Sequence, residues 1–213
     1  PAIKNANGTT QSKPGHLKFR DVNGDGVITA DDRTILGDAF PDFTYGITNT
    51  FNYNNFDFAF TLQGVQGVEV LNLARRYYGN YAGLYNVLRS TTNGWQSEAS
   101  PGDGMTPMID RNFNTAAGST VINNITSNFV EDGSFLRIRN ITLGYNLPQS
   151  ALRTLRLSSA RFSFTVQNAY TFTKYEGYNP EVSAQGGSPL VPGTDAGGYP
   201  LARSFNLGIN IGF

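Results

Sequence analysis

The stretch "RSFNLGINIGF" at residues 203–213 decides the fold, because its side chains alternate strictly between two chemical classes. Successive side chains of a β-strand point to opposite sides, so every second residue shares a face. One face of this strand carries only serine, asparagine and glycine, which are small and uncharged. The other face is wholly apolar and consists of Phe205, Leu207, Ile209, Ile211 and Phe213. The pattern predicts a strand with water on one side and an apolar medium on the other.

Four more segments show the same alternation, at about residues 43–53, 55–63, 135–147 and 161–173. Two of their apolar faces are interrupted by an asparagine, Asn49 in the first and Asn168 in the last. In the third, Arg137 and Arg139 share the face of Ile141. A β-bulge near Asn140, or projection of that half-strand beyond the hydrocarbon of a membrane, would explain these arginines. We expect projection.

A soluble β-sandwich shows the same alternation with its apolar face inward. Two features favour a membrane barrel instead. Aromatic residues gather toward the strand ends, as in an interfacial girdle. Short connections also alternate with long ones, at about residues 64–133 and 176–202, as in barrels with long loops on one rim. We therefore predict an all-β fold in which antiparallel strands form part of a transmembrane β-barrel with long extracellular loops.

Composition argues against several other functions. The 213 residues have a formal net charge of zero and are only 15% charged, so nothing indicates a nucleic acid or an anionic surface as partner. The chain has no cysteine, and its one histidine is His16. The chain therefore has too few candidate residues for Ser-His-Asp catalysis or for a histidine-bound zinc, and we expect that it is not an enzyme.

The stretch "DVNGDGVITADD" at residues 21–32 is the one metal-binding motif. Oxygen atoms recur at the loop positions that calcium requires, with Gly26 at a sharp turn. The last position holds Asp32 rather than the usual glutamate, with Asp31 beside it as an alternative. The shorter side chain suggests weak binding, of roughly millimolar affinity. An Asx-rich turn without an ion remains the alternative. The expected ligands are Asp21, Asn23, Asp25, Val27, Thr29 and Asp32.

The chain begins at Pro1 with no initiator methionine and no apolar leader, so we expect a mature or truncated piece. Five strands would leave two open edges, and unpaired backbone groups in lipid cost several kcal/mol each. We therefore expect the sheet to need the remainder of a barrel.

Several ordered motifs resemble the C-terminal portion of the SusC/RagA family of TonB-dependent outer-membrane transporters. The matching stretches lie at residues 15–47, 54–67, 134–148, 167–182 and 197–213, and include "NNFDFAFTLQGVQG" and "SFLRIRNITLGYNLP". The resemblance implies a 22-stranded barrel with an N-terminal plug, and a SusD-like surface lipoprotein as partner. It implies uptake of oligosaccharides or peptides across the bacterial outer membrane. The plug and the segment that contacts the TonB complex would lie outside this chain.

In such a barrel, residue 213 would lie on the periplasmic side, and alternating strand directions would make the loop before Phe43 extracellular. Calcium there would neutralise clustered acidic residues and stiffen a surface loop near the lipoprotein, which is a structural role.

An aromatic cluster in the first long loop is a candidate for substrate or partner contact, because aromatic rings stack on sugars and are enriched at interfaces. Packing within the loop explains the same residues. They are Tyr77, Tyr78, Tyr81, Tyr85 and Trp95.

Two other functions remain open. A calcium-stabilised, dockerin-like adhesion module would normally need a second cation loop, and none recurs here. A soluble carbohydrate-binding or carbohydrate-processing β-sandwich would call for paired carboxylates at a cleft, and Asp57 and Glu131 are too isolated to suggest a pair.

Overall fold

The computed structural model describes residues 14–79, 86–109, 125–183 and 192–213. The chain divides into two compact units. One comprises residues 38–72 and 131–213 and holds the large sheet. The other comprises residues 1–37 and 73–130 and holds the cation-type loop.

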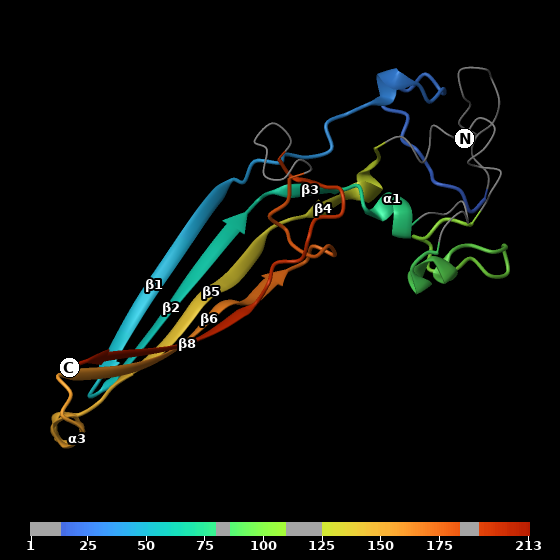
Figure 1. The fold of residues 1–213 in the computed structure, drawn as a ribbon. Coiled ribbons are helices and arrows are strands. Elements are labelled where there is room, and N and C mark those ends of the chain that lie inside the picture. Colours follow the sequence, from blue (N-terminus) through green and yellow to red (C-terminus); the bar gives the residue numbers. More distant parts are fainter. Residues whose placement is uncertain (1–13, 80–85, 110–124, 184–191) are drawn as a thin grey trace. The chain divides into compact units, whose positions relative to one another are not determined.

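The large sheet contains five long strands in the order β1-β2-β5-β6-β8, and every neighbouring pair is antiparallel. Figure 1 shows them side by side. The sequence prediction of five antiparallel strands is confirmed, with boundaries close to those expected. The strands are β1 (Phe43–Tyr53), β2 (Phe56–Gln66), β5 (Phe135–Asn146), β6 (Ser159–Thr173) and β8 (Ser204–Gly212).

Short connections gather at one end of this sheet, which we call the turn end (Figure 1). Asn54, in the tight turn between β1 and β2, has a φ of 52°, a left-handed conformation that asparagine tolerates well. The helix α3 (Gln149–Leu155) joins β5 to β6 at the same end, and β8 ends there. Long connections leave from the opposite end, which we call the loop end.

Bulges interrupt the ladder in the middle of the sheet. Phe60 pairs with Ile141, and Leu62 pairs with Ile138. Between these two pairs β2 advances by two residues, whereas β5 advances by three. The paired part of β6 advances four, from Val166 to Tyr170. The odd step in β5 moves alternate side chains to the other face. The bulge near Asn140 therefore exists, and our preference for projection was wrong.

A second, small sheet lies at the loop end, with the strand order β4-β3-β7. Its strands are β3 (Glu69–Asn72), β4 (Val130–Asp132) and β7 (Thr194–Asp195), and β3 pairs with β7 in parallel. Val68, Val70, Phe135 and Tyr175 are buried around it. This small core ties the connection between β6 and β8 to the end of the large sheet.

The second unit has short helical turns: η1 (Ala30–Asp32), α1 (Arg75–Tyr78), η2 (Arg89–Asn93) and η4 (Ser127–Phe129). Trp95 packs closely over Gly15, where a Cβ atom would lie 2.5 Å from the ring, and the Met108 N–H donates to the Gly15 carbonyl. Among the described residues, no helix has the length and apolar character needed to cross a membrane.

Candidate functional site

One face of the large sheet presents apolar side chains in register across all five strands. A single row contains Phe51, Phe58, Leu143, Phe164 and Leu207, which are direct neighbours from strand to strand. All five are exposed, and Leu207 is 85% exposed. So large a continuous apolar surface is unstable in water but suits contact with lipid.

The next row toward the turn end is mostly aromatic. Aromatic rings prefer the boundary between lipid and water, so this row fits the rim of a membrane-spanning belt. Phe56 and Tyr145 pack with their ring centroids 4.6 Å apart. The row contains Tyr53, Phe56, Tyr145, Phe162 and Ile209.

The two asparagines on the apolar face have different surroundings. Asn49 lies on β1, an edge strand, where it is exposed and pairs with Phe60 of β2. Asn168 has a φ of 51° at the bulge in β6, and its side-chain amide donates to the Ala202 carbonyl at 3.0 Å. Asn168 therefore anchors the chain just before β8 begins.

The opposite face is polar and nearly uncharged through its middle. Hydroxyl groups meet across neighbouring strands, with 3.1 Å between Thr48 and Thr61 and 3.1 Å between Thr142 and Thr165. Alanine, asparagine, glutamine and serine occupy the adjoining positions of β2, β5, β6 and β8. Charged groups on this face lie toward its two ends.

At the turn end, an ion pair crosses the sheet over a glycine. Arg161 on β6 donates to the Asp57 carboxylate on β2 with 2.5 Å between Nη2 and Oδ2. The intervening strand carries Gly144, where a Cβ atom would lie 2.4 Å from Asp57 and 2.5 Å from Arg161. Only glycine leaves room for this pair, which joins three strands.

At the loop end, Arg137 is the centre of a polar network. The β5 bulge places it on the polar face, where it is 3% exposed. Its guanidinium pairs with Glu181, donates to Thr171 and Asn179 at 2.9 Å each, and lies 4.8 Å from the Phe135 ring centre.

The second arginine that we expected on the apolar face also finds a polar partner. Arg139 donates to Gln63 at 2.8 Å, and Gln63 donates to Glu181 at 3.3 Å. Both arginines are therefore satisfied by groups on the polar face rather than by projection past a membrane surface.

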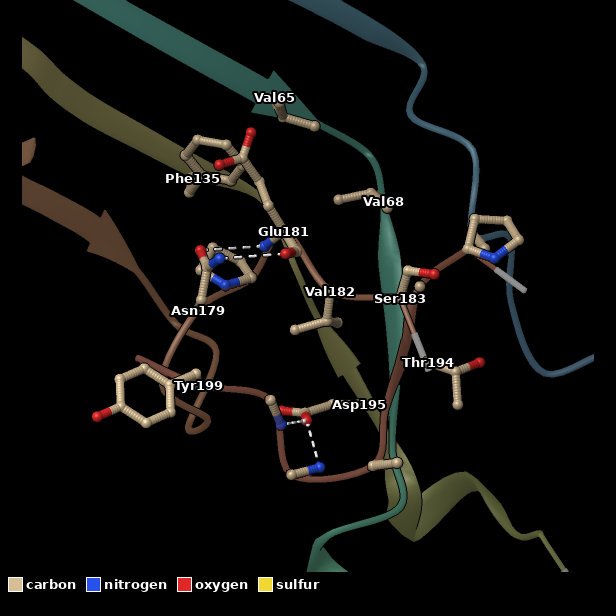
Figure 2. A pocket seen from close by; sticks show the side chains of 17 residues that line it. Val65, Val68, Phe135, Asn179, Glu181, Val182, Ser183, Thr194, Asp195 and Tyr199 are labelled. Atoms are coloured by element: carbon tan, nitrogen blue, oxygen red, sulfur yellow. Dashed lines mark hydrogen bonds between the residues drawn. The ribbon is translucent and has the colours of Figure 1, made fainter. Parts of the chain in front are cut away.

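A cavity of about 590 Å³ lies between this part of the sheet and the connection that follows β6. Figure 2 shows Val65, Val68 and Phe135 on the sheet side, with Val182 and Tyr199 among the residues from the connection. Tyr199 is 94% exposed. The cavity combines apolar walls with hydroxyl groups and two carboxylates.

Those two carboxylates are held within the protein's own bonds. Glu181 accepts from Arg137 and Gln63. Asp195 accepts from the Tyr175 hydroxyl at 2.5 Å and from the N–H groups of Gly197 and Gly198. Burial raises the pKa of Asp195, but these hydrogen bonds outweigh it and lower the pKa below its usual value.

The cation-type loop is built from local hydrogen bonds to its acidic side chains. Asp21 accepts from the N–H groups of Gly24 and Gly26, at 2.6 and 2.7 Å, and Gly26 has a φ of 80°. Asp32 accepts from the N–H groups of Thr29 and Val22 at 2.7 and 2.8 Å. These bonds fold residues 21–32 into a compact turn.

Asp32 accepts from the N–H of Val22, the residue after Asp21, so the two acidic ends of the loop are held together. Three or more acidic, histidine or cysteine side chains do not converge anywhere in the described segments. A cation here would therefore need the Asn23 amide oxygen, the Val27 carbonyl and the Thr29 hydroxyl as well as carboxylates. That mixture is the oxygen set that calcium accepts, so the residues fit the ion.

The aromatic cluster is only partly described. Tyr77 is 64% exposed on α1, and Tyr78 follows it. Trp95 is half-buried and packs over Gly15. Tyr81 and Tyr85 lie outside the described residues. Substrate or partner contact by these residues stays a prediction.

Sequence reasoning missed Glu181, Asn179 and Asp195, the groups that organise the loop end. None has a recognisable motif. The one available signal was the conflict between Arg137 and the apolar face, which pointed to a bulge and a polar partner.

Known proteins resemble this chain in sequence and in fold. No family model matches the chain. The chain is 35% identical over 206 residues to TonB-dependent receptor P3 of Formosa agariphila, covering 95% of this chain and 19% of that protein. It is 30% identical over 208 residues to TonB-dependent receptor SusC of Bacteroides thetaiotaomicron, covering 94% and 18%.

The solved structures of RagAB, described as a peptide transporter, have a similar fold. One of them superimposes with a TM-score of 0.71 at 23% identity, over 91% of this chain and 20% of that one. A second, in a closed-closed state, has a TM-score of 0.70 at 22% identity and covers 94% and 20%.

The apolar face, the polar opposite face and these relatives show that the chain corresponds to one segment of TonB-dependent receptors. Within that class, its sequence is similar to SusC, and its fold is similar to that of the RagAB structures. The chain spans about a fifth of the length of the curated relatives that it matches.

Proposed function

We propose that this chain is the C-terminal barrel segment of an importer that takes up oligosaccharides or peptides across the bacterial outer membrane. The observation that carries the proposal is the exposed apolar row that crosses all five strands in register. The similarity of the chain to SusC and to TonB-dependent receptors supports import driven by a TonB complex. Transport needs no covalent step, so we propose no enzymatic activity.

The proposal assigns a direction to the sheet. The turn end faces the periplasm, and the loop end, with connections 67–134 and 174–203, faces the medium. The edges of β1 and β8 pair with strands of the remainder of the barrel, because lipid cannot satisfy unpaired backbone groups. A plug domain and a SusD-like lipoprotein complete the importer.

Uptake by cells that carry the full-length transporter tests this function. We expect uptake of labelled oligosaccharides or of labelled peptides to fall to background when the gene is deleted or when the TonB complex is inactivated. The transporter should also co-purify with a SusD-like lipoprotein from detergent extracts. Unchanged uptake of both substrate classes, together with recovery of the transporter from the soluble fraction, would contradict the proposal.

We also propose that residues 21–32 bind calcium, with Asp21, Asn23, Asp25, Val27, Thr29 and Asp32 as ligands. The bond from the Val22 N–H to Asp32 supports this, because it joins the acidic ends of the loop, and a cation between carboxylates offsets their repulsion. The role is structural: the ion would hold an extracellular loop in one conformation.

Calcium removal is the corresponding test. In the full-length transporter, chelation should speed proteolytic cleavage within residues 21–32 and leave the strand content measured by circular dichroism unchanged. Protection should return with a midpoint at about 0.1–1 mM calcium, as in extracellular calcium modules. Asp21→Asn should abolish the calcium response. Asp103→Asn is the matched control, because Asp103 accepts local N–H bonds in another turn.

Acid should weaken the same loop. N–H groups of Thr29 and then Val22 hold the pKa of Asp32 below its ordinary value. The stability from a lowered pKa is present above the unfolded pKa and is lost as pH falls through the folded pKa. Protection should therefore be complete above the usual titration range of aspartate and be lost progressively as pH falls through that range toward the lowered pKa of Asp32. A rate of cleavage within residues 21–32 that changes with neither calcium nor pH would favour an Asx-rich turn without an ion.

A further inference from the structure

The connection between β6 and β8 does not simply project from the end of the sheet. The structure describes its residues 174–183 and 192–203, and these residues return over the polar face. Arg137 and Gln63 belong to that face; Asn179 of the connection accepts from Arg137, and Glu181 accepts from both. In a barrel the polar face lines the lumen.

Among the described residues of the five strands, large apolar side chains appear on the polar face only where the connection covers it. Val65 and Phe135 are cross-strand neighbours, and the ladder places them on the same side as Arg137 and Gln63. Phe135 is 4% exposed, and Val182 of the connection lines the cavity beside it. Apolar residues in a watery lumen would be costly, so this cover is part of the native structure.

A second set of bonds keeps the connection compact. The Glu131 carboxylate accepts from the Asn72 side chain and from the Glu176 N–H, each at 3.0 Å, and so links β3, β4 and the connection. Tyr175 and Asp195, which are both buried, bond to each other at 2.5 Å. The β3–β7 pairing adds backbone hydrogen bonds on the far side of the connection.

We propose that residues 174–183 and 192–203 of the β6–β8 connection form an inward-folded constriction of the barrel lumen at its extracellular end, and that Arg137 is the residue that positions them. This inference rests on the proposed transport function. Arg137 is suited to the role because its planar guanidinium addresses Thr171 on the wall and both Asn179 and Glu181 on the connection. The 590 Å³ cavity between wall and connection then lines the import path.

Cysteine labelling of the purified full-length transporter in lipid nanodiscs, without its lipoprotein, tests the position of the connection. The described chain supplies no cysteine of its own, and Tyr199→Cys places a thiol on its exposed surface. A small charged maleimide should modify this thiol readily, whereas a maleimide carrying a long polyethylene glycol chain should react far more slowly. Met105→Cys, at an 86% exposed residue, is the control that should react with both reagents.

The role of Arg137 is tested in the same background. Arg137→Met removes the contacts to Thr171, Asn179 and Glu181 without leaving a buried charge. The reaction of Tyr199→Cys with the long reagent should then rise at least about tenfold, which corresponds to roughly 1.4 kcal/mol of lost docking. Arg161→Met is the matched control: it breaks the ion pair on the same face at the turn end and should leave this rate unchanged.

Each result decides between a constriction and an outward loop. Equal reaction of Tyr199→Cys with both reagents in the native background would overturn the constriction, even if uptake were intact. An unchanged rate in Arg137→Met would overturn the role of Arg137. If Arg137→Met does not assemble, as judged by heat-dependent migration in gels, Glu181→Gln decides the question. Failure of the transport proposal itself would appear as lost or absent uptake, which labelling does not measure.

Discussion

Replacement of Glu181 by alanine should destabilise the loop end of the sheet more than any other single change in the connection. Arg137 is 3% exposed, and Glu181 is its only ion-pair partner among the described residues. Removing one partner of a buried ion pair leaves an uncompensated charge, which costs about 3–5 kcal/mol. The measurement is equilibrium unfolding of the full-length transporter in lipid vesicles, followed by proteolytic protection of the connection.

The opposite substitution gives a matched comparison. Arg137→Met leaves the carboxylate of Glu181, whose side chain is 41% exposed and can be hydrated. We therefore expect a smaller loss than for Glu181→Ala, although both variants break the same pair. Equal losses, or a larger loss for Arg137→Met, would show that packing rather than the buried charge dominates at this position.

A positive charge on the apolar face should be nearly as costly. Leu207 is 85% exposed in the row of apolar neighbours that crosses the sheet. Arginine on the lipid face of a barrel costs about 2–4 kcal/mol at the bilayer midplane and less toward the interfaces. Because Leu207 lies one row from the aromatic rim, we expect a loss of about 2 kcal/mol for Leu207→Arg.

The neighbouring residue supplies the control. Asn206 is on the polar face, paired with Thr165, so Asn206→Arg places the same side chain toward water. It should have little effect on unfolding in vesicles. If both variants lose the same stability, the apolar face does not contact lipid, and the assignment of the two faces is wrong.

The strands and their faces could be predicted because both depend on a local pattern. Alternation over residues 203–213 specifies the two faces of β8 without knowledge of any partner. The tight turn at Asn54 was likewise apparent from a short polar stretch between two alternating segments. A barrel strand meets lipid on one side, so its sequence alone records its environment.

The loop end could not be predicted because it depends on pairs that are distant in sequence. Arg137 and Glu181 are 44 residues apart, and Gln63 and Glu181 are 118 apart. The bulge that turns Arg137 to the polar face arises from a difference in residue count between β2 and β5, which neither strand reveals alone. The cation-type loop is intermediate: its compact turn follows from local chemistry, while occupancy by calcium depends on the medium.

Between the same two ladder positions, β2, β5 and β6 contain different numbers of residues, and this limits where the strands can gain or lose a residue. Arg139 is the residue without a counterpart in the ladder, so its deletion would restore even spacing in β5. The residues toward the loop end would keep their partners on β2, so Arg137 would still lie opposite Gln63 on the polar face and Ile138 opposite Leu62 on the apolar face. This strand can therefore lose one residue at the bulge without exchanging its faces, whereas a one-residue insertion or deletion in a regularly paired stretch would exchange them.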